Sequence, residues 1–142
     1  MQKLLYVGQT KFYEQIFIDR IESLGIECNF AKNVNEAVSG IDSKQYPAVY
    51  VGFFLCGIPL EGFKLPEEFC KSFESSEESF RNYQGGLYVV KHGLEAGLRV
   101  ITLEPILKRG GEKLREYQSD KLSVINFSLD NFNEVFREVF NL

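Results

Sequence analysis

The sequence predicts an α/β fold built on a five-stranded parallel sheet with helices on both of its faces. Two observations lead to this prediction. Short apolar segments alternate along the chain with longer segments whose apolar residues recur every three or four positions, and most connections between them are short. At 142 residues the chain also has the length of one domain, so we expect a single domain over residues 1–142.

The first strand–helix unit is marked at both of its ends. Residues 3–8 form the first expected strand, because an apolar run is typical of a strand that is buried on both faces. A helix should follow up to residue 24, with Thr10 as its candidate N-cap. Gly25 stands where a C-terminal glycine is expected to end that helix.

The second unit leads into the third strand. Residues 26–31 alternate apolar and polar side chains, which is typical of a strand near the edge of a sheet. Asn33 and Glu36 stand three positions apart before an apolar-periodic run, as in a capping box, so a helix should begin there. Pro47 breaks that segment, and residues 48–55 form the third expected strand.

The alternation is interrupted over residues 56–86, a stretch longer than most connections inside a compact domain. Its middle, residues 66–80, has a proline and two glutamates in its first turn, which favours a helix. The stretch is also rich in large apolar side chains. We therefore expect an insertion with one docked helix, which either covers the ends of the strands like a lid or presents an interaction patch.

The regular pattern resumes at Gly85 and Gly86, which we expect to begin a helix that ends at Gly97. The fourth strand is expected at residues 99–103. A helix interrupted by two glycines should follow over residues 106–118.

The last unit combines a fifth strand at residues 122–127 with a strongly amphipathic helix. The phenylalanines of that helix recur at the spacing of one helical face, which predicts that they pack on the sheet. Either Ser128 or Asp130 is its candidate N-cap.

Composition excludes several classes of function. A net charge of −4 without a basic stripe argues against a nucleic-acid partner. No apolar run is long enough to span a membrane and the N-terminus lacks a secretory signal, so we expect a cytoplasmic location without membrane contact. Three cysteines without CxxC spacing and a single histidine, His92, form no metal-ligand pattern, so we expect neither a metal nor a cofactor.

Five strand–helix units in this order resemble the receiver domain of response regulators, a flavodoxin-like fold. The most specific match is residues 47–62, where a proline, a buried strand and the loop Gly-Ile-Pro-Leu-Glu-Gly are similar to the third strand and the following turn of that family. The resemblance covers nearly the whole chain outside the insertion. It implies a doubly wound sheet with the strand order 2-1-3-4-5.

The residues that carry receiver chemistry are missing from the matching positions. The two metal-binding acids of the family fall on Gly8 and Gln9, and its phosphoacceptor aspartate falls on Phe53. Its Thr or Ser at the end of the fourth strand falls near Glu104, and its lysine at the end of the fifth strand falls near Asn126. Receiver chemistry needs clustered carboxylates to hold Mg²⁺ and one carboxylate to accept the phosphoryl group. The resemblance therefore implies a degenerate receiver, or pseudo-receiver, that is not phosphorylated at this site.

We expect such a module to be non-catalytic and to act by protein–protein contact, with a separate protein or a second copy of the chain as its partner. The resemblance implies a contact face made by the fourth helix, the fifth strand and the last helix of the family fold. Its candidate residues here are Lys108, Arg109, Tyr117 and Arg137.

The alternative is a small-molecule- or nucleotide-binding domain, or an enzyme, of flavodoxin-like fold. Open parallel sheets bind their ligands at the carboxyl ends of the strands, and the turn after the first strand could offer backbone N–H groups to an anion. The glycine-loop patterns of phosphate-binding proteins are missing from that turn. The candidate ligand-binding residues are Gln9, Thr10, Tyr83, Gly85, Gly86, Glu104 and Asn126.

Overall fold

The described strands form a five-stranded parallel sheet in the order β2-β1-β3-β4-β5. These strands are β1 (Gln2–Val7), β2 (Ile26–Ala31), β3 (Ala48–Val51), β4 (Arg99–Leu103) and β5 (Leu122–Ile125). The predicted parallel sheet and its strand order are therefore confirmed. The computed structural model describes residues 2–8, 14–52, 58–70, 78–103, 114–117, 119–126 and 128–142, with the backbone alone for residues 70 and 78–83.

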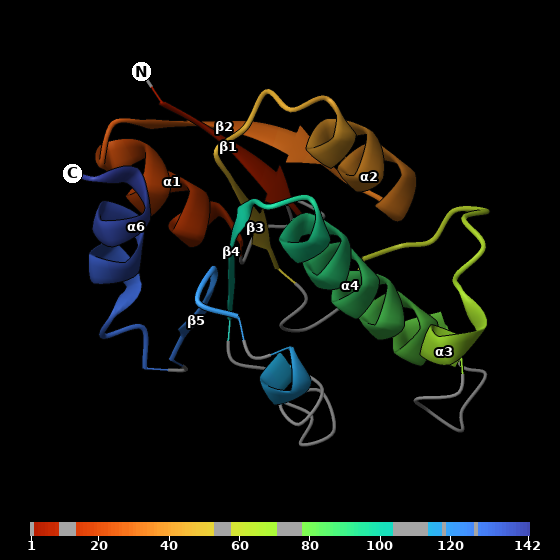
Figure 1. Cartoon of the computed structure of the whole chain (residues 1–142). Coiled ribbons are helices and arrows are strands. Elements are labelled where there is room, and N and C mark those ends of the chain that lie inside the picture. Colours follow the sequence, from red (N-terminus) through yellow and green to blue (C-terminus); the bar gives the residue numbers. More distant parts are fainter. Residues whose placement is uncertain are drawn as a thin grey trace.

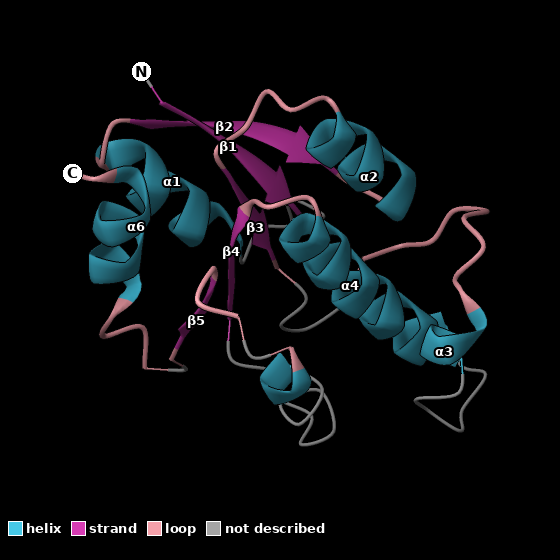
Figure 2. Ribbon diagram, in the orientation of Figure 1, coloured by secondary structure: helices cyan, strands magenta, loops and turns pink. Residues whose placement is uncertain are grey.

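Helices cover both faces of this sheet (Figures 1 and 2). They are α1 (Gln15–Ser23), α2 (Val34–Asp42), α3 (Glu67–Cys70), α4 (Glu78–Glu95) and α6 (Phe132–Phe140). The pair α1 and α6 packs on one face, and the pair α2 and α4 packs on the other. Of the helices that the structure describes, none is long and apolar enough to cross a membrane.

Each central strand contributes to two cores, because successive residues of a strand point to opposite faces of the sheet. In β1, Leu4 and Tyr6 are buried under α1 and α6, whereas Leu5 and Val7 are buried under α2 and α4. This arrangement explains why the first strand is apolar over most of its length. The prediction that it is a strand buried on both faces is confirmed.

The structure confirms the predicted helix ends at three positions. Asn33 caps α2, since its side-chain oxygen accepts a hydrogen bond from the backbone N–H of Glu36 at 2.8 Å and its amide donates to the Glu36 carboxylate at 3.0 Å. Gly25 after α1 and Gly97 after α4 have φ angles of 83° and 84°, a left-handed conformation that glycine adopts without strain. Thr10, the predicted N-cap of the first helix, lies outside the described residues.

The prediction that a helix begins at Gly85 and Gly86 is wrong. Helix α4 begins at Glu78 and runs through both glycines, which are buried. A Cβ atom on Gly85 would lie 2.7 Å from the carbonyl oxygen of Ile58, so the glycine allows the segment before α3 to pack directly onto α4. Residues 78–86 therefore belong to a regular crossover helix and not to an insertion.

The segment between β3 and α4 packs inward where it is described. Ile58, Leu65 and Phe69 are buried in the core that also contains the apolar side chains of α2 and α4. The carbonyl oxygen of Pro59 accepts a hydrogen bond from the backbone N–H of Val34 at 3.0 Å, which holds the segment against the start of α2. These apolar side chains serve the core and are not displayed as an exposed interaction patch.

Other predicted elements are described only in part. Of the helix predicted over residues 66–80, the structure describes α3 and the first residues of α4, and residues 71–77 lie outside the described residues. Of the helix predicted over residues 106–118, the structure describes one helical turn at residues 114–117. Strands β3 and β5 both end earlier than the sequence predicts.

The predicted N-caps of the last helix, Ser128 and Asp130, are wrong. Helix α6 begins one residue after Asn131, which therefore occupies the N-cap position. The Asn131 side chain accepts a hydrogen bond from the backbone N–H of Asn126 at 3.0 Å and donates one to the carbonyl oxygen of Val124 at 3.3 Å. It ties the start of α6 to the end of β5, a tertiary contact that the local pattern of capping residues does not reveal.

Candidate functional site

The candidate site lies where the two central strands end. Strands β1 and β3 are parallel neighbours, with Tyr6 opposite Tyr50 and Val7 opposite Val51. Their carboxyl ends therefore meet at one edge of the sheet. In open parallel sheets ligands bind outside such carboxyl ends, at the point where the strand order reverses. Here that point lies between β1 and β3.

Glycines follow both strands at this edge. The backbone N–H of Gly8 donates to the carbonyl oxygen of Ala31 at 3.0 Å, and the N–H of Gly52 donates to that of Val7 at 2.9 Å. These bonds continue the pairing of the sheet by one residue beyond each strand. Gly8 is one of the positions where the resemblance places a metal-binding acid, and it offers no side chain.

A buried carboxylate occupies the space beside these glycines. Glu14, the residue before α1, is only 5% exposed, and its Oε1 atom accepts a hydrogen bond from the Tyr6 hydroxyl at 2.9 Å. A Cβ atom on Gly8 would collide with this oxygen, and one on Gly52 would lie 3.2 Å from it. The acid at the strand ends therefore comes from the start of a helix and not from the strands.

Two buried tyrosines complete this cluster. The ring centroids of Tyr6 and Tyr50 are 4.8 Å apart, and both side chains are fully buried. Burial raises the pKa of both hydroxyls far above the ordinary value, and the negative charge of Glu14 raises each pKa further, so both stay protonated. The Tyr50 hydroxyl is buried without a hydrogen-bond partner in the described part of the chain.

This cluster does not fit the Mg²⁺ ion that the receiver fold implies. Mg²⁺ requires octahedral oxygen ligands, and in receivers several clustered carboxylates supply them. Among the described residues, no group of three or more His, Cys, Asp or Glu side chains could hold a metal ion. At this edge the described residues supply the single carboxylate of Glu14, which is engaged by Tyr6.

Of the predicted ligand-binding residues, the structure describes Gly85, Gly86 and Asn126 in full. Gly85 and Gly86 were expected at the start of a helix, where N–H groups are free, but they lie inside α4. Asn126 follows β5 and is exposed. The side chain of Tyr83, also in α4, is not described. Six predicted site residues lie outside the described residues altogether: Gln9, Thr10, Phe53, Glu104, Lys108 and Arg109.

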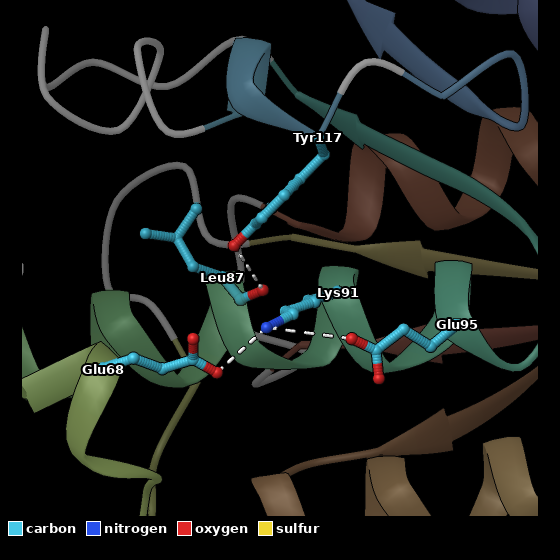
Figure 3. A network of polar contacts seen from close by, with 5 residues as sticks. All are labelled: Glu68, Leu87, Lys91, Glu95 and Tyr117. Carbon is cyan, nitrogen blue, oxygen red and sulfur yellow. Dashed lines mark hydrogen bonds and ion pairs between the residues drawn. The ribbon is translucent and has the colours of Figure 1, made fainter.

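The predicted contact residues Tyr117 and Arg137 belong to different faces of the sheet. Tyr117 is half-buried against the α2–α4 core, and its hydroxyl donates to the carbonyl oxygen of Leu87 in α4 at 3.5 Å (Figure 3). Burial raises the pKa of Tyr117 to about 12, with the charge of Glu116 as the next cause. Arg137 is exposed on α6, so of these two side chains it is the more accessible to solvent.

Polar contacts on the α4 side link this helix to its neighbours. Lys91 lies between Glu68 of α3 at 2.9 Å and Glu95 of its own helix at 3.7 Å (Figure 3). His92 contacts the Asp42 carboxylate of α2 at 2.8 Å. The single histidine of the chain therefore links α4 to α2.

Sequence reasoning missed the buried cluster. The sequence contained an indication of this cluster, because the spacing of Glu14, Ile18 and Ile21 places them on one helical face, and Ile18 and Ile21 are apolar. An acid on an apolar face indicates a buried carboxylate. Sequence reasoning also missed Thr102 of β4, whose hydroxyl donates to the carbonyl oxygen of Val51 at 2.7 Å.

Neither a protein-family model nor a curated protein sequence matches this chain. Solved structures match its fold. The response regulator TrrA from Thermotoga maritima, in complex with Mg²⁺ and BeF, is 18% identical with a TM-score of 0.61, over 98% of this chain and 99% of that chain. The receiver domain of a sensor histidine kinase from Pseudomonas aeruginosa, with a magnesium ion in its active site cleft, is 12% identical with a TM-score of 0.61, over 99% of this chain and 98% of that one.

The signal receiver domain of a modulated diguanylate cyclase from Desulfovibrio desulfuricans gives a TM-score of 0.64 at 12% identity, over 99% of this chain and 94% of that one. At these identities the likeness shows the fold. The chain thus has the receiver (CheY-like) fold.

Proposed function

We propose that this protein is a pseudo-receiver, a non-catalytic signalling module that binds another protein or a second copy of itself without being phosphorylated. The observation that carries the proposal is the lack of an acidic side chain at Gly8, at the end of β1. Gly8 stands where the resemblance places a metal-binding acid, and the Glu14 carboxylate beside it is buried and hydrogen-bonded to Tyr6. A site of this kind lacks the clustered carboxylates that hold Mg²⁺ and accept a phosphoryl group.

A thermal shift assay with Mg²⁺ and beryllium fluoride tests the loss of receiver chemistry. TrrA, which was solved in complex with Mg²⁺ and BeF, is the positive control. We expect the melting temperature of the control to rise and that of this protein to stay within the scatter of repeats. A comparable rise in this protein would contradict the proposal, because a ligand that binds the native state stabilises it.

The partner surface is proposed to include α6. Arg137 is exposed there, and a charged side chain at the rim of an interface influences both association and choice of partner. In affinity capture from the native cells, Arg137→Glu should reduce partner recovery. Lys64→Glu, which reverses an exposed charge outside α6, serves as the matched control. Equal recovery with both variants would count against this surface.

The proposal of a small-molecule site has less support. Its candidate glycines lie inside α4, and the Glu14 carboxylate fills the space beside Gly8 and Gly52. Native mass spectrometry of the gently purified protein separates the two functions. A bound protein or a homodimer supports the interaction module, whereas a stoichiometric small molecule would favour a ligand-binding domain.

A further inference from the structure

Glycine is required for space, not for backbone conformation, at the ends of β1 and β3. Among the described residues the glycines with positive φ are Gly25, Gly62 and Gly97, so neither Gly8 nor Gly52 is among them. An L-residue could adopt either backbone conformation. A side chain on Gly8 would instead collide with Glu14 Oε1, and its Cβ would also lie 2.9 Å from Cε1 of Tyr6.

The carboxylate in this space is held by the fold. Glu14 lies on the face of α1 that carries the buried residues Ile18 and Ile21, and the Tyr6 hydroxyl donates to it at 2.9 Å. A buried charge needs hydrogen bonds to persist in an apolar core. An acid that served only solubility would point to solvent, whereas this one points to the sheet.

We propose that Glu14 is an internal ligand of the strand-end site. Its carboxylate occupies the place where an open parallel sheet receives a ligand, and its volume and charge exclude a side chain on Gly8 and an external anion alike. This inference rests on the proposed function in taking the strand ends as a former receiver site. Because the Glu14 carboxylate occupies this place, signals reach this protein at another surface.

A double-mutant cycle between Gly8 and Glu14 tests the assignment. Gly8→Ala alone should reduce the folding equilibrium constant roughly 10- to 100-fold, because an extra carbon in a filled core is costly. In the Glu14→Ala background the same change should be at least about 5-fold less damaging, since contact residues show coupling of that order. The remaining cost comes from the Tyr6 ring, which also faces Gly8. Urea denaturation measures all four proteins.

Two controls isolate the cause. A Cβ atom on Gly40 would lie 2.7 Å from Cδ2 of Leu5 on the opposite face of the sheet, so Gly40→Ala should be equally damaging with and without Glu14. Glu14→Gln keeps the volume and loses the charge. In that background Gly8→Ala should remain damaging, because the volume causes the conflict.

The outcome is decisive even where one variant does not fold. If Gly8→Ala is unfolded and the Gly8→Ala/Glu14→Ala double variant folds, the coupling is shown directly. Additive effects, or rescue of Gly40→Ala by Glu14→Ala to the same extent, would overturn the assignment. Such a result would leave the proposed signalling function standing, because beryllium fluoride and partner capture test that function independently.

Discussion

Tyr6 and Tyr50 form a matched pair for testing how the buried cluster is stabilised. They stand opposite each other in neighbouring strands, both are fully buried, and their ring centroids are 4.8 Å apart. They differ in one respect. The Tyr6 hydroxyl donates to Glu14 at 2.9 Å, whereas the Tyr50 hydroxyl has no partner among the described residues.

Replacing each tyrosine by phenylalanine removes one hydroxyl and keeps the ring. Tyr6→Phe should lower the free energy of unfolding by about 1.5–3 kcal/mol, the usual value for a hydrogen bond to a charged group. Tyr50→Phe removes a buried hydroxyl that makes no bond, and an unsatisfied buried polar group costs about 1–3 kcal/mol. We therefore expect this variant to be as stable as the wild type or more stable.

Urea denaturation followed by circular dichroism provides the measurement. The free energies are comparable if the slope of unfolding with urea is the same in all three proteins, which shows that the unfolded states are equally exposed. The reasoning is refuted if Tyr50→Phe is destabilised as much as Tyr6→Phe. That result would mean that the Tyr50 hydroxyl is hydrogen-bonded in solution.

Three further predictions concern ionisation and capping. The pKa values of Tyr6 and Tyr50 are raised in the folded state, so the unfolded chain loses these protons first as the pH rises above ~10. The free energy of unfolding should therefore be constant below pH ~10 and fall above it by up to about 1.4 kcal/mol per pH unit for each tyrosine. Urea denaturation at alkaline pH should show that this free energy falls less steeply with pH in Tyr50→Phe. Burial raises the pKa of Cys28 to about 12 from 9.0, so iodoacetamide should alkylate this thiol in the folded protein roughly 1000-fold more slowly than an ordinary thiol. Peptide mass mapping should show that alkylation becomes fast once urea unfolds the chain. Fast labelling of Cys28 in the folded protein would contradict this prediction. Asn131→Ala should cost about 1 kcal/mol by breaking the side-chain bonds to Val124 and Asn126, and urea denaturation measures this loss. Asp130→Ala should leave the urea midpoint unchanged, and the opposite ranking would restore Asp130 as the cap.

Local patterns were sufficient to predict the elements whose evidence lies within a few residues. The capping box at Asn33 and Glu36 and the terminal glycines Gly25 and Gly97 are such cases, because a cap satisfies backbone groups in its own helix turn. The apolar run in β1 likewise predicted a strand buried on both faces.

The sequence pattern gave a wrong prediction for a glycine that is needed for a contact between distant segments of the chain. Gly85 looks like a helix boundary in the sequence, yet it lies inside α4. Glycine is needed there because a Cβ atom would lie 2.7 Å from the carbonyl oxygen of Ile58. Asn131 shows the same limit. It occupies the position of an N-cap, but its side chain forms hydrogen bonds at the end of β5. The local pattern of capping residues does not show that β5 lies close enough for these bonds.

The sequence by itself determined the order of strands and helices and the lack of an acid at Gly8, since both can be seen in the residues themselves. Only the tertiary structure decided that the Glu14 carboxylate lies at the ends of β1 and β3. Glu14 reaches Gly8 and Gly52 because parallel pairing brings the ends of β1 and β3 together beneath the start of α1. Gly52 is distant from Gly8 and Glu14 along the chain and becomes their neighbour only when the sheet has formed, so the shared site cannot be derived from spacing alone.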